Sequence, residues 1–222
     1  MVKLKAFIKK NLFNIIWIAM AVVLFVVDII TKQIIMRTMN VGDNIPVIGN
    51  FLSINYVINE GAAFGIQFKD PIVNKVMWIV ISILGSAGLI FFFVWKNNKL
   101  SNITKASLML MASGALGNLI DRAFYTADYL GIDKVAYPNG GVVDFIGANF
   151  GKLGEFPRFN VADSCLVIGT FMLIIVLFIS EVKEILNKKK EVVPESAEKV
   201  LSKDELERLE LEAKDKADSE NE

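Results

Sequence analysis

Histidine is absent from this sequence of 222 residues. Its absence excludes Ser-His and Cys-His nucleophilic systems and most zinc hydrolase sites, so a general base must be Asp, Glu, Lys or Tyr. The single cysteine, Cys165, has no partner for an intrachain disulfide. Since it lies in an apolar pattern, we expect it to be a small core residue.

Net charge is also absent, because 24 basic residues balance 24 acidic ones. The overall charge therefore gives no indication of nucleic-acid binding. More than half of the residues are hydrophobic, which is typical of membrane proteins and not of soluble ones.

Four apolar stretches are long enough to cross a hydrocarbon core, which takes about 20 helical residues. They lie near 13–35, 72–95, 106–124 and 161–179. The third is diluted by small and polar residues, which favours an interior helix packed closely against its neighbours. The sequence thus predicts a mainly α membrane domain over 1–185, followed by a charged tail, helical or disordered, over 186–222.

Lysines mark one side of these predicted spans. They precede the first span, fill the link between the second and third, and follow the fourth, as at Lys9, Lys99 and Lys183. Basic residues flank membrane spans on the cytoplasmic side, so we expect both termini in the cytoplasm. The two longer links, 37–71 and 123–159, then face outward.

The first outward link contains a strand pattern. Leu52, Ile54, Tyr56 and Ile58 alternate with mostly polar residues, which predicts a strand with one apolar face. In the second link, a Pro-Asn-Gly-Gly turn at 138–141 precedes two valines. We expect a small extracytoplasmic sheet on the outer membrane surface.

Acidic and amide residues stand at the ends of the predicted spans, where ionisable groups are costly and mark working sites. Asp28 and Lys32 are four apart and share a helix face, where they can form an ion pair. Two further pairs have a spacing of three, and one more acid lies nearby: Asn118 with Asp121, Asn160 with Asp163, and Asp144.

Each of these residues also has a simpler interpretation. Asp28 and Lys32 can anchor the helix at its depth, and Asn160 can be a helix N-cap. Arg122 can be an interfacial cation, or it can hold a carboxylate or carbonyl by a forked hydrogen bond.

Two neighbouring carboxyl groups cannot both ionise cheaply, so one keeps a proton and the other can act as base toward water. This chemistry predicts an intramembrane aspartyl hydrolase. Proton- or ion-coupled transport explains the same residues and stays open as the alternative. An inactive scaffold would leave the clustered carboxylates without a function.

Five ordered motifs resemble those of bacterial lipoprotein signal peptidase, also called signal peptidase II. They are D-I-I-T-K at 28–32, N-E-G-A-A-F at 59–64, G-A-L-G-N-L-I-D-R at 114–122, V-V-D-F at 142–145 and F-N-V-A-D-S at 159–164. The resemblance implies an aspartyl endopeptidase that removes the signal peptide of prolipoproteins just before the diacylglyceryl-modified cysteine.

The resemblance also implies the roles of individual residues. Asp144 and Asp163 match the catalytic dyad. Residues that match supporting or substrate-binding positions are Asp28, Lys32, Asn59, Gly61, Asn118, Asp121, Arg122, Asn160 and Ala162. The resemblance implies a bacterial cytoplasmic membrane protein with no metal or organic cofactor. Its expected partners are prolipoprotein substrates, membrane lipids and globomycin-type inhibitors.

Two segments depart from the family pattern. The link 123–143 is longer than usual, which predicts an inserted loop beside Asp144 that acts as a flexible lid. The charged tail over 186–222 is likewise extra.

Overall fold

A computed structural model describes residues 2–61, 67–135, 137–192, 208 and 211. The chain forms two compact units, Met1–Val176 and Leu177–Glu222. The main elements are α1 (Val2–Thr38), β1 (Asn44–Ile48), β2 (Leu52–Asn59), α2 (Pro71–Lys96), α3 (Asn102–Phe124), α4 (Ala127–Leu130), β3 (Val142–Asn149), β4 (Glu155–Phe159) and α5 (Val161–Val192). Two short 3₁₀ turns lie at Asn97–Lys99 and Gly151–Leu153.

Four helical segments are long and apolar enough to span a membrane: Asn11–Thr38, Pro71–Lys99, Asn102–Phe124 and Val161–Lys188. The four predicted spans are therefore confirmed, and the protein is a multi-pass membrane protein of mainly helical structure. In the third span 56% of the most apolar stretch is buried, against 6–11% in the others. The prediction of an interior third helix is confirmed.

Glycines let α3 approach its neighbours. A Cβ at Gly117 would lie 2.7 Å from Asp28 Oδ2 and 3.0 Å from Ala162 Cβ, and one at Gly114 would collide with the Ala162 carbonyl oxygen. Only residues without a side chain allow α1, α3 and α5 to meet this closely. The small residues that weaken the hydropathy of α3 are thus the ones that bring polar groups together.

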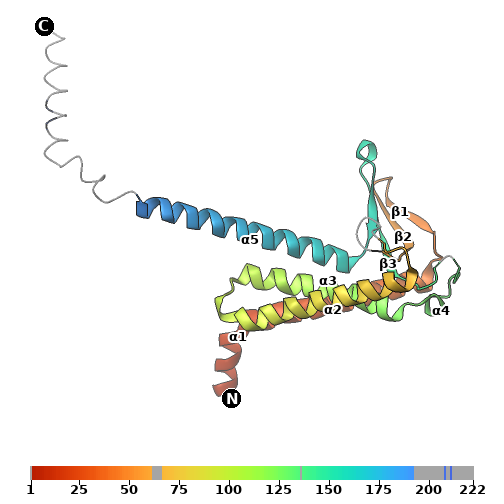
Figure 1. The fold of residues 1–222 in the computed structure, drawn as a ribbon, viewed down its shortest axis with the longest axis horizontal. Helices are drawn as coiled ribbons and strands as arrows, with labels where there is room; N and C mark the ends of the chain where they lie inside the picture. The colour runs from red at the N-terminus through yellow and green to blue at the C-terminus, as the bar shows by residue number, and fades with distance from the viewer. Residues whose placement is uncertain (1, 62–66, 136, 193–207, 209–210, 212–222) are drawn as a thin grey trace, which may run out of the picture. The chain divides into compact units, whose positions relative to one another are not determined.

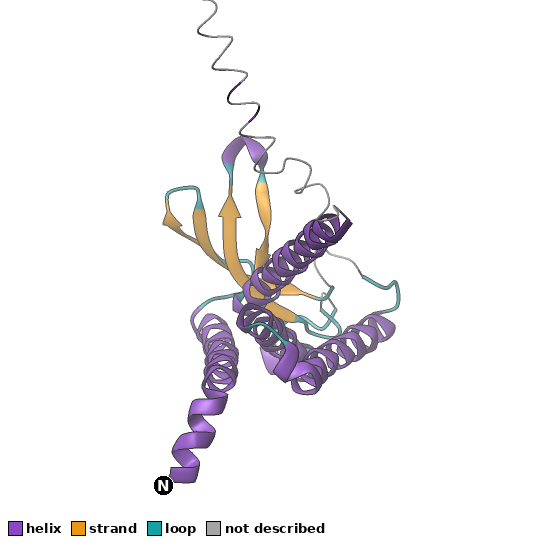
Figure 2. Cartoon of the chain, turned by 90° about the vertical axis from the view of Figure 1, so that its left-hand side faces the viewer, coloured by secondary structure: helices purple, strands orange, loops and turns teal. Residues whose placement is uncertain are grey.

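The strands form one antiparallel sheet in the order β1-β2-β3-β4. The predicted strand over residues 52–58 corresponds to β2. Figure 1 shows the sheet at one end of α1, α2 and α3, with its strands running across the direction of these helices. In Figure 2 the strands extend beyond the helices that lie in front of them.

The inner part of the sheet packs on the end of α1. Its apolar core contains Ile35, Tyr56, Ile58, Val143 and Phe145. This core fixes β2 and β3 over the helix end, because each strand has alternate side chains buried there. The inner ends of both strands consequently meet the polar residues of α1 and α3.

The predicted tail starts near residue 186, and α5 continues without a break to Val192. Most of the tail, 193–207, 209–210 and 212–222, lies outside the described residues. The division into a membrane domain and a charged tail at residue 185 therefore stays a prediction.

Candidate active site

Lys32 lies fully buried at the centre of a polar cluster. Its ammonium Nζ is 2.7 Å from Asp28 Oδ2 and 2.8 Å from Asp121 Oδ2, and it donates to Asn118 Oδ1 at 3.1 Å. All three ammonium protons thus have an acceptor. The predicted ion pair between Asp28 and Lys32 is confirmed, and it extends across the helix interface to Asp121.

The two acids of this cluster also hold backbone groups. Asp28 Oδ1 accepts from the Ala162 backbone N at 2.8 Å, at the start of α5. Asp121 Oδ2 accepts from the Val143 N at 3.2 Å, on β3. Because Ala162 Cβ faces Gly117, a larger residue at either position would separate the helices. The cluster therefore joins α1, α3, β3 and α5 around one point.

Asn160 connects this cluster to the two acids Asp144 and Asp163. It caps α5, since its Oδ1 accepts from the Asp163 N at 2.8 Å and its own N donates to Asp163 Oδ2 at 3.1 Å. This reciprocal pairing is a capping box. The Asn160 Nδ2 points back and donates to Asp144 Oδ1 at 2.7 Å and to Asn118 Oδ1 at 3.1 Å. The N-cap interpretation is confirmed, and the same side chain also joins the polar network.

The second carboxylate oxygen of Asp144 and that of Asp163 each accept a hydrogen bond from an asparagine side chain. Asn118 Nδ2 donates to Asp163 Oδ1 at 2.8 Å, and Asn59 Nδ2 donates to Asp144 Oδ2 at 2.9 Å. Asp144 and Asp163 are thus held from β2, α3 and the cap of α5 at once. Asp144 is 2% exposed, so little water reaches it.

The segment of Asn59 is fixed by Arg122. Gly61 N donates to Asn59 Oδ1 at 3.0 Å, and the Gly61 carbonyl accepts from Arg122 Nη2 at 3.1 Å. Arg122 also donates to the Asn118 carbonyl at 3.4 Å. Among the described residues its buried Nε has no hydrogen-bond partner. Every predicted site residue therefore belongs to one connected network.

The surroundings of Asp144 raise the pKa of its carboxyl group. Burial, followed by the charge of Asp163, raises its pKa to about 8. Hydrogen bonds from Asn59 and Asn160 and the charge of Lys32 oppose this shift. Asp163 lies in the first turn of α5. The raised pKa means that Asp144 retains its proton at neutral pH.

The sequence analysis missed Asn74, a buried residue in the first turns of α2. Its Nδ2 donates to the Glu60 carbonyl at 2.6 Å, and its Oδ1 accepts from Trp78 Nε1 and the Phe68 N, each at 3.0 Å. Asn74 thereby fixes the backbone between Asn59 and Gly61. The available signal was an amide at the start of a strongly apolar span.

The segment 123–143, predicted to be an insertion, is held at both ends in its described part. Gln33 Nε2 on α1 donates at 3.0 Å to the hydroxyls of Tyr125 and Tyr129, whose rings stack 5.1 Å apart. At the other end, Lys75 on α2 donates to the Asn139 carbonyl at 3.2 Å. A lid motion would have to break these contacts.

Within the described residues, no group of three or more His, Cys, Asp or Glu side chains is arranged to hold a metal ion. Lys32 already occupies the space between Asp28 and Asp121. The described polar network contains acids, amides and the two cations Lys32 and Arg122.

Comparison with known proteins agrees with these observations. The family model for signal peptidase (SPase) II matches residues 20–179, which include every residue of the network. A protein named lipoprotein signal peptidase from Staphylococcus haemolyticus is 39% identical over 170 residues, covering 76% of this chain and 94% of the relative. A protein of the same name from Clostridium novyi is 36% identical over 152 residues, covering 68% and 90%.

Two solved structures have a similar fold. Both are described as bacterial membrane enzyme structures obtained by the in meso method, at 2.3 and 1.9 Å resolution. Their TM-scores are 0.59 and 0.58, with 34% and 36% sequence identity. The alignments cover 73% and 72% of this chain, and 87% and 91% of theirs.

Proposed function

The chain belongs to the signal peptidase II family of membrane peptidases, and on that premise we propose that it is an aspartyl endopeptidase with Asp144 and Asp163 as its catalytic dyad. Its substrates are prolipoproteins, cut before the diacylglyceryl-modified cysteine. The observation that carries the proposal is that Asn160 binds both carboxylates, Asp144 at 2.7 Å and Asp163 at 3.1 Å. One residue thus binds both acids, which supports a shared reacting position.

In the proposed reaction, ionised Asp163 takes a proton from water while protonated Asp144 donates a hydrogen bond to the scissile carbonyl oxygen. Water oxygen forms a bond to the carbonyl carbon, and the Asp144 proton moves to the carbonyl oxygen. The resulting tetrahedral species collapses when the peptide nitrogen receives the proton held by Asp163 and the C–N bond breaks. One of the two hydroxyl groups of the tetrahedral species returns its proton to Asp144. The products are a carboxylic acid and an amine.

The supporting residues have distinct roles in this proposal. Asn59, Asn118 and Asn160 orient the dyad, while Asp28, Lys32 and Asp121 fix the helices that carry it. Arg122 fixes the Gly61 segment beside the dyad through its hydrogen bond to the Gly61 carbonyl.

The proposed location is the bacterial cytoplasmic membrane, with both termini in the cytoplasm and the dyad at the outer face. Supporting this location, Asp163 lies at the start of the fourth span, at the end opposite to the basic residues Lys183 and Lys188. Lipid-anchored substrates would approach along the membrane, and globomycin-type inhibitors would compete with them.

The test uses the purified full chain in lipid with a diacylglyceryl-modified prolipoprotein. We expect cleavage before the modified cysteine without any ion gradient, and its loss in Asp144→Asn and Asp163→Asn. Asp128→Asn, which changes an exposed acid of the inserted segment, is the matched control and should cut normally. Cleavage that survives loss of either dyad acid would refute the assignment. A silent wild type would favour ion-coupled transport, which flux measurements in sealed vesicles would detect.

A further inference from the structure

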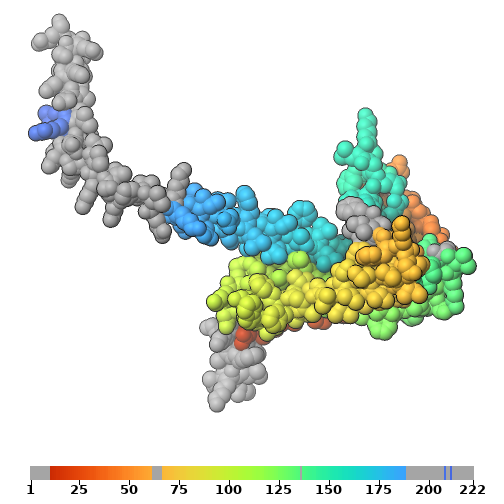
Figure 3. Space-filling model, in the orientation of Figure 1, coloured from red at the N-terminus to blue at the C-terminus, as the bar shows by residue number. Residues whose placement is uncertain are grey.

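Asn74 is a buried amide in the first turns of α2, a strongly apolar span. Figures 1 and 3 show these turns at the end of the helices that carries the sheet. The other buried polar residue of α2, Ser86, donates to carbonyls of its own helix, at Ser82 and Ile83. Two of the three side-chain hydrogen bonds of Asn74 instead leave the helix. A buried amide in an apolar span is costly, so its partners indicate its role.

The amide of Asn74 holds one peptide group beside the dyad. Its Nδ2 donates to the Glu60 carbonyl at 2.6 Å. The nitrogen of the same peptide group belongs to Gly61, and it donates to Asn59 Oδ1 at 3.0 Å. Because a peptide group is planar, Asn74 fixes both ends of it, with the carbonyl toward α2 and the N–H toward Asn59.

That peptide group determines which end of the Asn59 amide faces Asp144. With Oδ1 bound to the Gly61 N–H, Asn59 Nδ2 is left to donate to Asp144 Oδ2, at 2.9 Å. If the peptide turned over, its carbonyl would face Asn59 and attract Nδ2, and Asp144 would lose this donor. Hydrogen bonds in such a chain also polarise one another. The direction of the whole chain thus depends on Asn74.

The neighbours of Asn74 keep its side chain from rotating. Asn74 Oδ1 accepts from Trp78 Nε1 and from the Phe68 N, each at 3.0 Å. The centroid of the Trp78 ring lies 6.0 Å from Cζ of Arg122, which donates to the Gly61 carbonyl at 3.1 Å. Both polar atoms of the Asn74 amide therefore have partners, and turning the amide over would break three hydrogen bonds.

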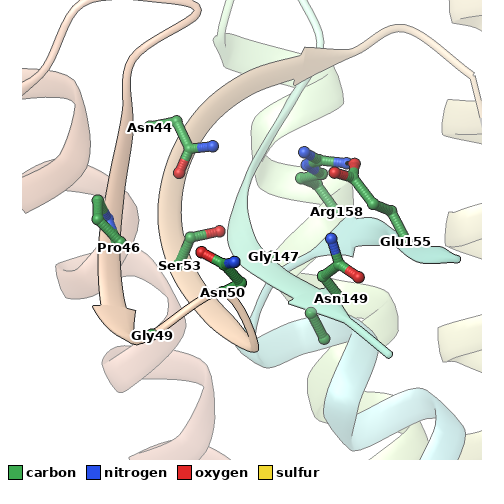
Figure 4. Close-up of a pocket in the computed structure, with 10 residues that line it drawn as sticks. Asn44, Pro46, Gly49, Asn50, Ser53, Gly147, Asn149, Glu155 and Arg158 are labelled. Carbon is green, nitrogen blue, oxygen red and sulfur yellow. Dashed lines mark hydrogen bonds and ion pairs between the residues drawn. The ribbon is translucent and has the colours of Figure 1, made fainter. Parts of the chain in front are cut away.

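A turn of the same kind follows β3, and the comparison shows what Asn74 adds. Asn149 Oδ1 accepts from Gly151 N at 2.8 Å, two residues further along the chain. This asparagine lines a polar groove of about 350 Å³ on the sheet (Figure 4). The corresponding carbonyl, of Phe150, accepts from the nearby Leu153 N at 3.4 Å. The turn after β2 is held instead by Asn74, from a separate helix.

We infer that Asn74 is a positioning residue of the dyad, which fixes the 60–61 peptide and through it turns the donor end of the Asn59 amide toward Asp144. This inference rests on the proposed function. Charged groups from three elements also face Asp144: Lys32 of α1, Arg122 of α3 and Asp163 of α5.

The proton of Asp144 provides the test. The hydrogen bond from Asn59 stabilises the ionised carboxylate, so losing its direction should raise the pKa of Asp144. We expect Asn74→Ala to move the alkaline fall of kcat/KM to higher pH, by no more than Asn59→Ala does. In the double variant Asn74→Ala should add no further shift, because its effect passes through Asn59. Ser86→Ala is the matched control for a buried polar residue of α2, and its profile should match that of the wild type.

Infrared titration of the Asp144 carboxyl group, assigned by its loss in Asp144→Asn, follows the same proton without substrate. A folded wild type that does not cut prolipoprotein would refute the proposed function, while the infrared shift would still test Asn74. No shift in Asn74→Ala, or a shift that persists in the Asn59→Ala background, would overturn the inference. If Asn74→Ala does not fold, Asn74→Ser replaces it, because a hydroxyl can satisfy one of the three partners.

Discussion

Two pairs of buried carboxylates lie in the same site, and they differ in what surrounds them. Asp28 and Asp121 share one ammonium group, with Lys32 within 2.8 Å of both. Asp144 and Asp163 are bonded to the amides of Asn59, Asn118 and Asn160, together with the Asn160 backbone. The first pair binds one shared cation, whereas the second is held by neutral amides.

The difference explains why residues of one type serve two purposes. A buried ion pair that loses a partner is strongly destabilising, so the lysine-bound pair holds the helices in place. Two acids oriented by neutral amides instead share a proton, which is the condition for acid–base catalysis. Four mutational and pH tests separate the two pairs.

The largest expected effect is on Lys32. Lys32→Met leaves Asp28 and Asp121 buried without a cation, so we expect a loss of about 3–5 kcal/mol in the free energy of unfolding. Lys134→Met is the control, because its ion pair with Asp128 is largely exposed and contributes little. Unfolding in detergent measures both. Equal stability of the two variants would mean that the buried cluster does not hold the fold together.

Acid-to-amide substitutions should separate the pairs directly. Asp121→Asn weakens a charged hydrogen bond to Lys32, so we expect a loss of about 2 kcal/mol in unfolding free energy. Asp144 carries its proton at neutral pH only in the folded chain, so Asp144→Asn removes the cost of that protonation and should not destabilise the fold, while it should abolish cleavage. If both variants lose the same stability, the pairs do not differ as described.

The protonation of Asp144 gives activity and stability a predictable pH dependence. Its pKa is raised to about 8, so the dyad loses its shared proton as pH rises through that value. We expect kcat/KM to fall about tenfold for each pH unit above about 8, which forms the alkaline limb of the pH profile. The folded chain also binds this proton more tightly than the unfolded chain. Its contribution to stability is therefore complete below the unfolded pKa near 4 and is lost as pH rises to about 8.

The control is Asp144→Asn, whose unfolding free energy should lack this part of the pH dependence. An activity profile that stays flat from pH 7 to 10 would contradict the shared proton.

Much of this site followed from spacing in the sequence. The ion pair of Asp28 with Lys32 follows from helical periodicity, and the contact of Asn160 with Asp163 follows from helix capping. Both act over a few neighbouring residues. The contact of Lys32 with Asp121 joins two helices, and its distance depends on the closeness that Gly117 permits. Such contacts between elements have no local pattern, so only the structure shows them.

The outer strands were missed for a different reason. β1 and β4 each contain a proline, Pro46 and Pro157, which weakens a strand interpretation of the sequence. Both are edge strands, where a missing N–H is tolerated because one side of the strand has no partner. The strand propensity of a short segment cannot distinguish an edge strand from a loop. β2, with its long alternating pattern, was identified.

The smallest expected effect concerns the hydrogen bond from Asn59 to Asp144, which is 2.9 Å long and stabilises the ionised acid. Asn59→Ala should therefore move the alkaline limb of kcat/KM upward, by less than about one pH unit for a hydrogen bond of about 1 kcal/mol. The matched control is Asn55→Ala on the same strand, because the buried Asn55 amide donates to Ser53 and not to the dyad. Its limb should stay at the wild-type position. A downward shift in Asn59→Ala, or an equal shift in Asn55→Ala, would show that the amide acts on the fold as a whole and not on the proton of the dyad.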